Sequence, residues 1–226
     1  MRPAARRAIK PALFLLCLVP AALLGWDAAR GALTDPIKEI THRTGWWVIT
    51  LLTITLAVTP VRRLTGWNGI TKYRRLLGLF AFFYACLHFL TYLVLDQFFA
   101  WSFIVEDVAE RPYITVGFAA FLLLLSLAVT STNGWIRRLG KRWQRLHSLI
   151  YVAALAGVIH FLWQVKADVR EPTIFGLIIA GLLAIRLVRR RKRQLRPVGA
   201  ADSSAEPSGG LPPPIPRVNP RLGSPA

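Results

Sequence analysis

The sequence predicts an all-α, polytopic membrane protein: a six-transmembrane-helix bundle followed by a disordered C-terminal tail. The chain is 54% hydrophobic with a mean hydropathy of +0.43, and its apolar residues form runs long enough to cross a bilayer. Lys and Arg gather in alternate loops between these runs. From Pro197 the chain is rich in Pro, Gly and Ser, which leaves little to bury. We expect a basic N-terminus over 1–10, a membrane domain over 11–191 and the tail over 192–226.

The first three spans follow from apolar runs and their ends, at Pro11–Trp26, Gly45–Pro60 and Leu76–Leu95. A basic start before a short apolar run also suits a cleaved signal peptide. No small-x-small cleavage site precedes Asp27, so we expect an uncleaved first helix. Pro60 and the basic loop after it are expected to end the second span.

The last three spans are expected at Tyr113–Thr130, Leu146–Gln164 and Pro172–Arg186. The loop before them, Asp96–Arg111, is acidic, and the loop at 131–145 is strongly basic.

The formal net charge of +18 does not indicate nucleic-acid binding, because the basic residues flank membrane spans. The positive-inside rule places both termini and the loops after the second and fourth spans in the cytoplasm. The two cysteines, Cys17 and Cys86, lie within apolar runs and are expected to be packing residues. The sequence has no P-loop, nucleophile elbow, HExxH or CxxC motif, and its few carboxylates lie in loops, which disfavours a proton-coupled transporter.

Three histidines lie in the predicted spans, where an ionisable side chain is costly and is a functional candidate by default. His88 follows Arg75 by 13 residues and His160 follows His147 by 13 residues, which is about 20 Å of helix in each case. His88 and His160 therefore share a level on two parallel helices, as two axial ligands of one haem iron require.

His147 lies near the start of the fifth span, level with Arg74 or Arg75 on the third, so a second bis-histidine haem lacks an obvious partner. It remains either a ligand or an interfacial residue. His42 is expected to be a surface histidine before the second helix. The alternative interpretation of all these histidines is that they join helices by hydrogen bonds.

Four stretches of the chain resemble the ferric reductase-like transmembrane domain, the superfamily of the NADPH oxidases and metalloreductases. They read THRTGWWVITLLTITLAVTP, YRRLLGLFAFFYACLHFLTYL, RPYITVGFAAFLLLLSLAVTST and KRWQRLHSLIYVAALAGVIHFLW. The resemblance covers about Ile9 to Arg191. The chain lacks the fused flavin and NADPH domain and the second histidine of the third helix. It is most similar to the small stand-alone haem-binding members that serve a methionine sulfoxide reductase.

This resemblance implies a non-catalytic electron-transfer subunit of the bacterial inner membrane, with haem b held by His88 and His160 and with His147 as a further candidate ligand. It implies electrons drawn from the quinone pool or a cytoplasmic flavin reductase and passed to a periplasmic molybdopterin enzyme of the MsrP type. FMN is implied too, with Arg74 and Arg75 as candidates to hold its phosphate. The acidic loop is a candidate docking surface.

The alternatives are a stand-alone haem metalloreductase, a cytochrome b subunit for another periplasmic partner, and a haem-free scaffold or transporter.

Overall fold

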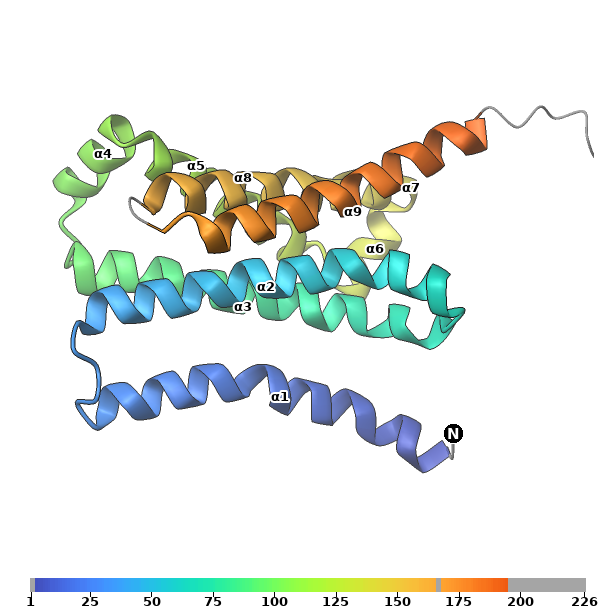
Figure 1. Cartoon of the computed structure of the whole chain (residues 1–226), viewed down its shortest axis with the longest axis horizontal. Coiled ribbons are helices and arrows are strands. Elements are labelled where there is room, and N and C mark those ends of the chain that lie inside the picture. Colours follow the sequence, from blue (N-terminus) through green and yellow to red (C-terminus); the bar gives the residue numbers. More distant parts are fainter. Residues whose placement is uncertain (1–2, 166–167, 195–226) are drawn as a thin grey trace, which may run out of the picture. The chain divides into compact units, whose positions relative to one another are not determined.

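The computed structural model describes residues 3–165 and 168–194, and all regular structure in these ranges is helical (Figure 1). Six helical segments are long and apolar enough to cross a membrane, which confirms the predicted fold class. Their bounds are Ala8–Ala29, Pro36–Thr65, Asn68–Asp96, Pro112–Val129, Lys141–Gln164 and Arg170–Val188.

The second span is longer at both ends than predicted. Helix α1 covers Pro3–Ala29, and α2 covers Pro36–Thr65. Pro36 stands in the first turn of α2, where its missing N–H costs nothing, and the side chain of Asp35 caps that turn. Pro60 lies inside α2, which ends at Gly66 with φ 71°, because one lost backbone bond does not break a helix that its neighbours support.

The predicted position of His42 was therefore wrong, since this exposed residue lies within α2 and not before it.

The third span consists of three consecutive helical segments. The 3-10 helix η1 (Asn68–Tyr73) leads into α3 (Arg74–Leu90), and the π-helix η2 (Thr91–Asp96) completes it. The acidic loop that follows contains a helix that the sequence reading missed, α4 (Trp101–Glu110). The side chain of Asp107 holds α4 to the end of the span, accepting hydrogen bonds from Tyr92 at 3.2 Å and Gln97 at 3.0 Å.

The second half of the chain repeats the pattern of long spans and short connecting helices. Helix α5 (Pro112–Val129) is followed by α6 (Asn133–Leu139) and α7 (Lys141–Leu146) in the basic loop. The 3-10 turn η3 (His147–Leu149) joins α7 to α8 (Ile150–Gln164), and α9 (Arg170–Gln194) follows. The tail predicted from residue 192 lies outside the described residues, except for 192–194 at the end of α9.

Two helix pairs form the centre of the bundle, α2 with α3 and α5 with α8 (Figure 1). Contacts of α3 with α5 and of α2 with α8 join the two pairs. Helix α1 is held to α3 by Tyr84, whose hydroxyl donates to Cys17 O at 2.8 Å and accepts from Ala21 N at 3.1 Å. This frame places His88 of α3 in one pair and His160 of α8 in the other.

Candidate functional site: a facing histidine pair

His88 projects from α3 against the beginning of α2. Its Nδ1–H donates to the carbonyl oxygen of Thr41 at 2.9 Å, and the hydroxyl of Thr44 lies 3.4 Å from the same nitrogen. Thr44 is buried, and its hydroxyl donates to Ile40 O at 2.6 Å. Gly45 faces the ring so closely that a Cβ there would lie 3.2 Å from Cε1 and Nδ1. These contacts fix the orientation of the imidazole.

His160 repeats this arrangement on the other helix pair. Its Nδ1–H donates to the carbonyl oxygen of Tyr113 at 2.7 Å, at the beginning of α5. Gly117, one turn further along α5, faces the ring, and a Cβ there would lie only 2.7 Å from Cε1 and Nδ1. The imidazole of His160 therefore occupies the space that a side chain at position 117 would fill.

The two imidazoles face each other between the helix pairs. Their ring centres lie 6.1 Å apart, and their planes are nearly perpendicular at 85°. In the part of the chain that the structure describes, each ring bonds through Nδ1 and no hydrogen bond reaches either Nε2. A carbonyl on Nδ1–H favours the tautomer whose Nε2 lone pair is free for a metal.

This geometry fits one metal ion between the two rings. With a metal–nitrogen bond of about 2.0 Å on each side, imidazoles that share one metal have ring centres roughly 6 Å apart. Within the described ranges, no cluster of three or more His, Cys, Asp or Glu forms a different kind of metal site. A two-histidine donor set is the kind that completes the axial coordination of a haem iron. The predicted proximity of His88 and His160 is confirmed, and their ligation of iron remains a prediction.

Aromatic side chains border the pair on one side. Phe89, next to His88, stacks on Phe121 of α5 with ring centres 4.7 Å apart, and Phe82 stacks on the same ring at 6.0 Å. These flat apolar groups fill part of the space between α3 and α5.

His147 does not join the pair, because it lies in η3 at the start of the fifth span. Its ring stacks on Trp143 with centres 3.9 Å apart. Its Nε2 lies 3.3 Å from the hydroxyl of Ser131, and its Nδ1 lies 3.3 Å from the carbonyl oxygen of Trp143. Both ring nitrogens thus have protein partners.

Arg74 and Arg75, the candidates for holding a phosphate, stand at the beginning of α3. Arg74 is close enough to His147 for the two side chains to interact electrostatically. Arg75 donates from Nη1 to Asn133 Oδ1 at 2.8 Å, which ties α3 to α6. Neither arginine is among the residues that line the pocket at this end, and their role in holding a phosphate stays a prediction.

Sequence reasoning missed the residues that orient the two histidines. Thr41 and Tyr113 act through backbone carbonyls, and no side-chain pattern marks such a role. Gly45 and Gly117 did leave a signal, because an isolated glycine inside a helical run often has a packing or functional reason.

Comparison with known proteins identifies the family. Residues 44–158 match the model of the ferric reductase like transmembrane component. The chain is 50% identical over 192 residues to the protein-methionine-sulfoxide reductase heme-binding subunit MsrQ of Xanthomonas axonopodis pv. citri, which covers 81% of this chain and 87% of that protein. It is 51% identical over 183 residues to the MsrQ subunit of Herminiimonas arsenicoxydans, covering 79% of this chain and 84% of that protein. The chain belongs to the MsrQ family of heme-binding subunits, within the ferric reductase-like membrane proteins.

Proposed function

We propose that this chain binds haem b through His88 and His160 and acts as the membrane electron-transfer subunit of a methionine sulfoxide reductase system. The observation that carries this proposal is the facing pair of imidazoles, each with Nδ1 on a backbone carbonyl and Nε2 free. The name of the relatives, a heme-binding subunit, agrees with it.

The chain's own residues hold and orient the two ligands. The carbonyl groups of Thr41 and Tyr113 keep the proton of each imidazole on Nδ1. His88 and His160 would hold haem b, which would supply one-electron redox chemistry, and occupation of the iron by two imidazoles would favour electron transfer over oxygen activation. His147, whose two ring nitrogens have partners, is not needed for this assignment.

The direction of transfer follows from the proposed orientation in the bacterial inner membrane. The end of the bundle with the basic loops is proposed to face the cytoplasm, together with both termini, as the distribution of Lys and Arg supports. Electrons would come from the quinone pool or a cytoplasmic flavin reductase on that side, and the recipient would lie in the periplasm.

The proposed recipient is a periplasmic molybdopterin enzyme of the MsrP type that reduces methionine sulfoxide. The relatives' name, which refers to a protein-methionine-sulfoxide reductase, supports such a partner. On the acidic loop, Asp107 is already paired with Arg111 at 3.1 Å, whereas Glu106 and Glu110 are exposed on α4. Together with the exposed Asp96, these two carboxylates are the acidic groups of the loop that are open to a docking partner.

FMN remains a proposal that rests on the family resemblance alone, with Arg74 and Arg75 as the candidate residues. Arg75 would have to release Asn133 to bind a phosphate. We derive no step through FMN.

Visible spectra of the detergent-purified full chain and of three variants test the haem assignment. The wild type should show a reducible low-spin b-type spectrum. His88→Ala and His160→Ala should each lose it, because each removes one axial ligand, and His147→Ala should keep it. The exposed His42→Ala is the matched control. Fluorescence of the supernatant after acid precipitation shows whether the same preparations contain FMN.

Three results would contradict the proposal. A folded but colourless wild type, purified after growth with added haem, would favour a haem-free scaffold or transporter. Retention of the spectrum in His88→Ala or His160→Ala would remove the pair as ligands. Faster reduction of ferric chelates than of a purified MsrP-type enzyme would favour a metalloreductase.

A further inference from the structure

The charges of this bundle are separated between its two ends. Apart from Asp202 and Glu206, which lie outside the described residues, every carboxylate stands at the end that carries α4. These residues are Asp27, Asp35, Glu39, Asp96, Glu106, Asp107, Glu110, Asp168 and Glu171. Two arginines at that end form ion pairs: Arg43 bonds Asp27 at 2.8 Å and Glu39 at 3.3 Å, and Arg111 bonds Asp107. We call this the acidic end.

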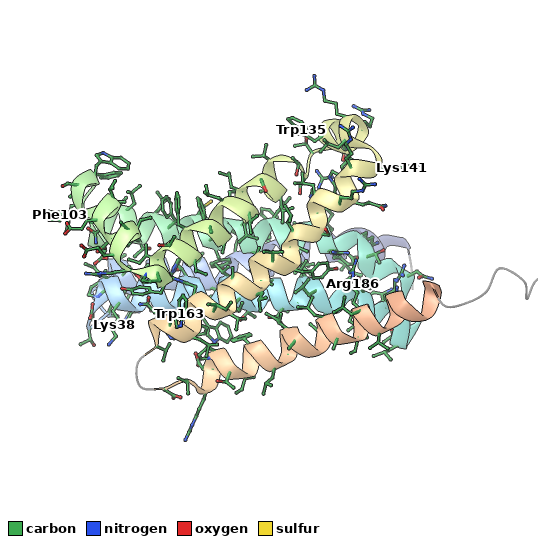
Figure 2. The ribbon with its side chains drawn as sticks, turned by 90° about the horizontal axis from the view of Figure 1, so that it is seen from above. Lys38, Phe103, Trp135, Lys141, Trp163 and Arg186 are labelled. Carbon is green, nitrogen blue, oxygen red and sulfur yellow. The ribbon has the colours of Figure 1, made fainter. Side chains whose placement is uncertain are left out.

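The opposite end, which we call the basic end, has cations without carboxylates. It contains Arg62, Arg63, Lys72, Arg74, Arg75, Arg137, Arg138, Lys141, Arg142 and Arg145. In the described part of the chain, none of these side chains forms an ion pair with a carboxylate. Figure 2 shows Trp135 and Lys141 at this end, far from Phe103 and Lys38 at the acidic end. Among the described residues, the positive charge at the basic end thus has no carboxylate partner and is available to an anionic ligand.

A shallow pocket of about 570 Å³, largely open to the surface, lies at the basic end. It is lined by Thr132, Gly134, Trp135, Arg137 and Arg138, on α6 and the residue before it. The guanidinium of Arg138 lies 5.7 Å from the centre of the Trp135 ring. The residues that line the pocket thus include two arginines, a threonine and a tryptophan. Guanidinium groups bind phosphate oxygens by charge-assisted hydrogen bonds.

The position of the pocket is fixed by contacts with two spans. Asn133, between the lining residues, accepts the hydrogen bond from Arg75 of α3 at 2.8 Å. Trp143 of α7 donates from Nε1 to Thr130 O at 2.9 Å, at the end of α5. These contacts hold the connection between α5 and α8 against the bundle.

The level of the pocket in the membrane identifies the source of the phosphate. The fourth span ends at Val129, and Thr132 follows it by three residues, which reach at most about 10 Å. The headgroup region begins where the hydrocarbon core, about 30 Å thick, ends. Lys and Arg pockets at the cytoplasmic ends of membrane helices are also where anionic lipid headgroups bind.

We propose that this pocket binds the phosphate group of an anionic phospholipid, with Arg137 and Arg138 as the contacting cations. The phospholipid brings negative charge to an end where the described residues include no carboxylate. The pair in the pocket differs from Lys141 and Arg142 of α7, which carry the same charge but do not line it.

The proposal is tested by comparing the two cations that line the pocket with the two that do not. The double variants Arg137→Gln/Arg138→Gln and Lys141→Gln/Arg142→Gln each remove two positive charges from neighbouring helices. Native mass spectrometry of the delipidated full chain, titrated with phosphatidylglycerol or phosphatidylcholine, gives the dissociation constant of each lipid. The wild type should prefer phosphatidylglycerol. The pocket variant should bind it about tenfold more weakly, as expected for losing charged hydrogen bonds, and the α7 variant should change less than about twofold.

Equal weakening by the two double variants would overturn the proposal, since it would indicate diffuse attraction to the whole basic end. Absence of a preference for phosphatidylglycerol over phosphatidylcholine would overturn it too. Competition with FMN and with inorganic phosphate distinguishes the source: displacement of the lipid by micromolar FMN would assign the pocket to a soluble phosphate compound instead. Gel filtration and the thermal unfolding midpoint show whether each variant is folded, and the Lys141→Gln/Arg142→Gln protein is the matched reference for both.

Discussion

His147 and His160 lie on one span, 13 residues apart, and have opposite surroundings. The Nε2 of His160 has no hydrogen-bond partner in the described chain, and its ring faces His88 at 6.1 Å. The Nε2 of His147 lies 3.3 Å from the Ser131 hydroxyl, and its ring is stacked on Trp143. The first environment presents a nitrogen lone pair to a space between helices, and the second uses both nitrogens within the protein.

A histidine at a suitable depth in the membrane is therefore not by itself a candidate metal ligand. Each histidine of the facing pair lies against a glycine on the neighbouring helix, and its Nδ1–H meets a backbone carbonyl there. The ring of His147 instead stacks on Trp143, with ring centres 3.9 Å apart. What distinguishes the facing pair from His147 is the set of residues that orient each imidazole.

Replacing the glycines that face the two histidines should have the largest effect on haem content. In Gly117→Ala the new Cβ would lie 2.7 Å from the His160 ring, so the ring must leave its position and its bond to Tyr113. We expect haem content to fall below about half, since overpacking costs about 1–3 kcal/mol. Gly45→Ala should reduce it less, because its Cβ would lie 3.2 Å from the His88 ring. The ratio of Soret to protein absorbance in purified protein measures both.

Gly157→Ala is the matched control for both glycine variants. Its Cβ would meet only Ile49, at an ordinary 3.6 Å, while the gain in helix propensity is the same as at the other two positions. A haem content in Gly117→Ala equal to that in Gly157→Ala would show that close contact with a glycine does not set the position of His160.

Hydropathy and charge made the six spans predictable, because crossing a bilayer demands long apolar helices and orients them by their basic flanks. Counting residues from the basic loops also placed His88 and His160 at one level. The helix α4 was not predictable in the same way. Its ten residues include Glu106, Asp107 and Glu110, and this amphipathic segment is too short and too acidic to stand out from a loop.

The supporting residues of the site were predictable only in part. That Thr41 and Tyr113 would offer carbonyls to the histidines depends on how α2 packs on α3 and how α5 packs on α8. A single sequence does not specify such packing registers. The start of α2 was missed for a local reason. Residues 36–44 include Lys38, Glu39 and Arg43 and do not read as part of an apolar span, although Pro36 suits a first helical turn.

The smallest effect is expected from Thr44→Val. This variant tests whether the hydroxyl of Thr44, next to His88, influences the redox potential of the site. Thr44 is buried, and its hydroxyl lies 3.4 Å from His88 Nδ1, whose main partner is Thr41 O at 2.9 Å. Valine keeps the shape of the side chain and removes only the Thr44 hydroxyl, the weaker of the two acceptors near His88 Nδ1. Haem content should stay unchanged, because the bond to Thr41 remains.

The midpoint potential of this variant, measured by a spectroscopic redox titration, should rise by about 20 mV. A weaker acceptor on Nδ1–H makes the imidazole a poorer electron donor, which disfavours ferric iron, and a hydrogen bond of about 0.5 kcal/mol corresponds to this shift for one electron. Thr53→Val, which loses a hydroxyl bonded only to Ile49 O on the same helix, should leave the potential unchanged. An equal shift in both variants, or a fall in Thr44→Val, would show that the hydroxyl of Thr44 does not act on His88.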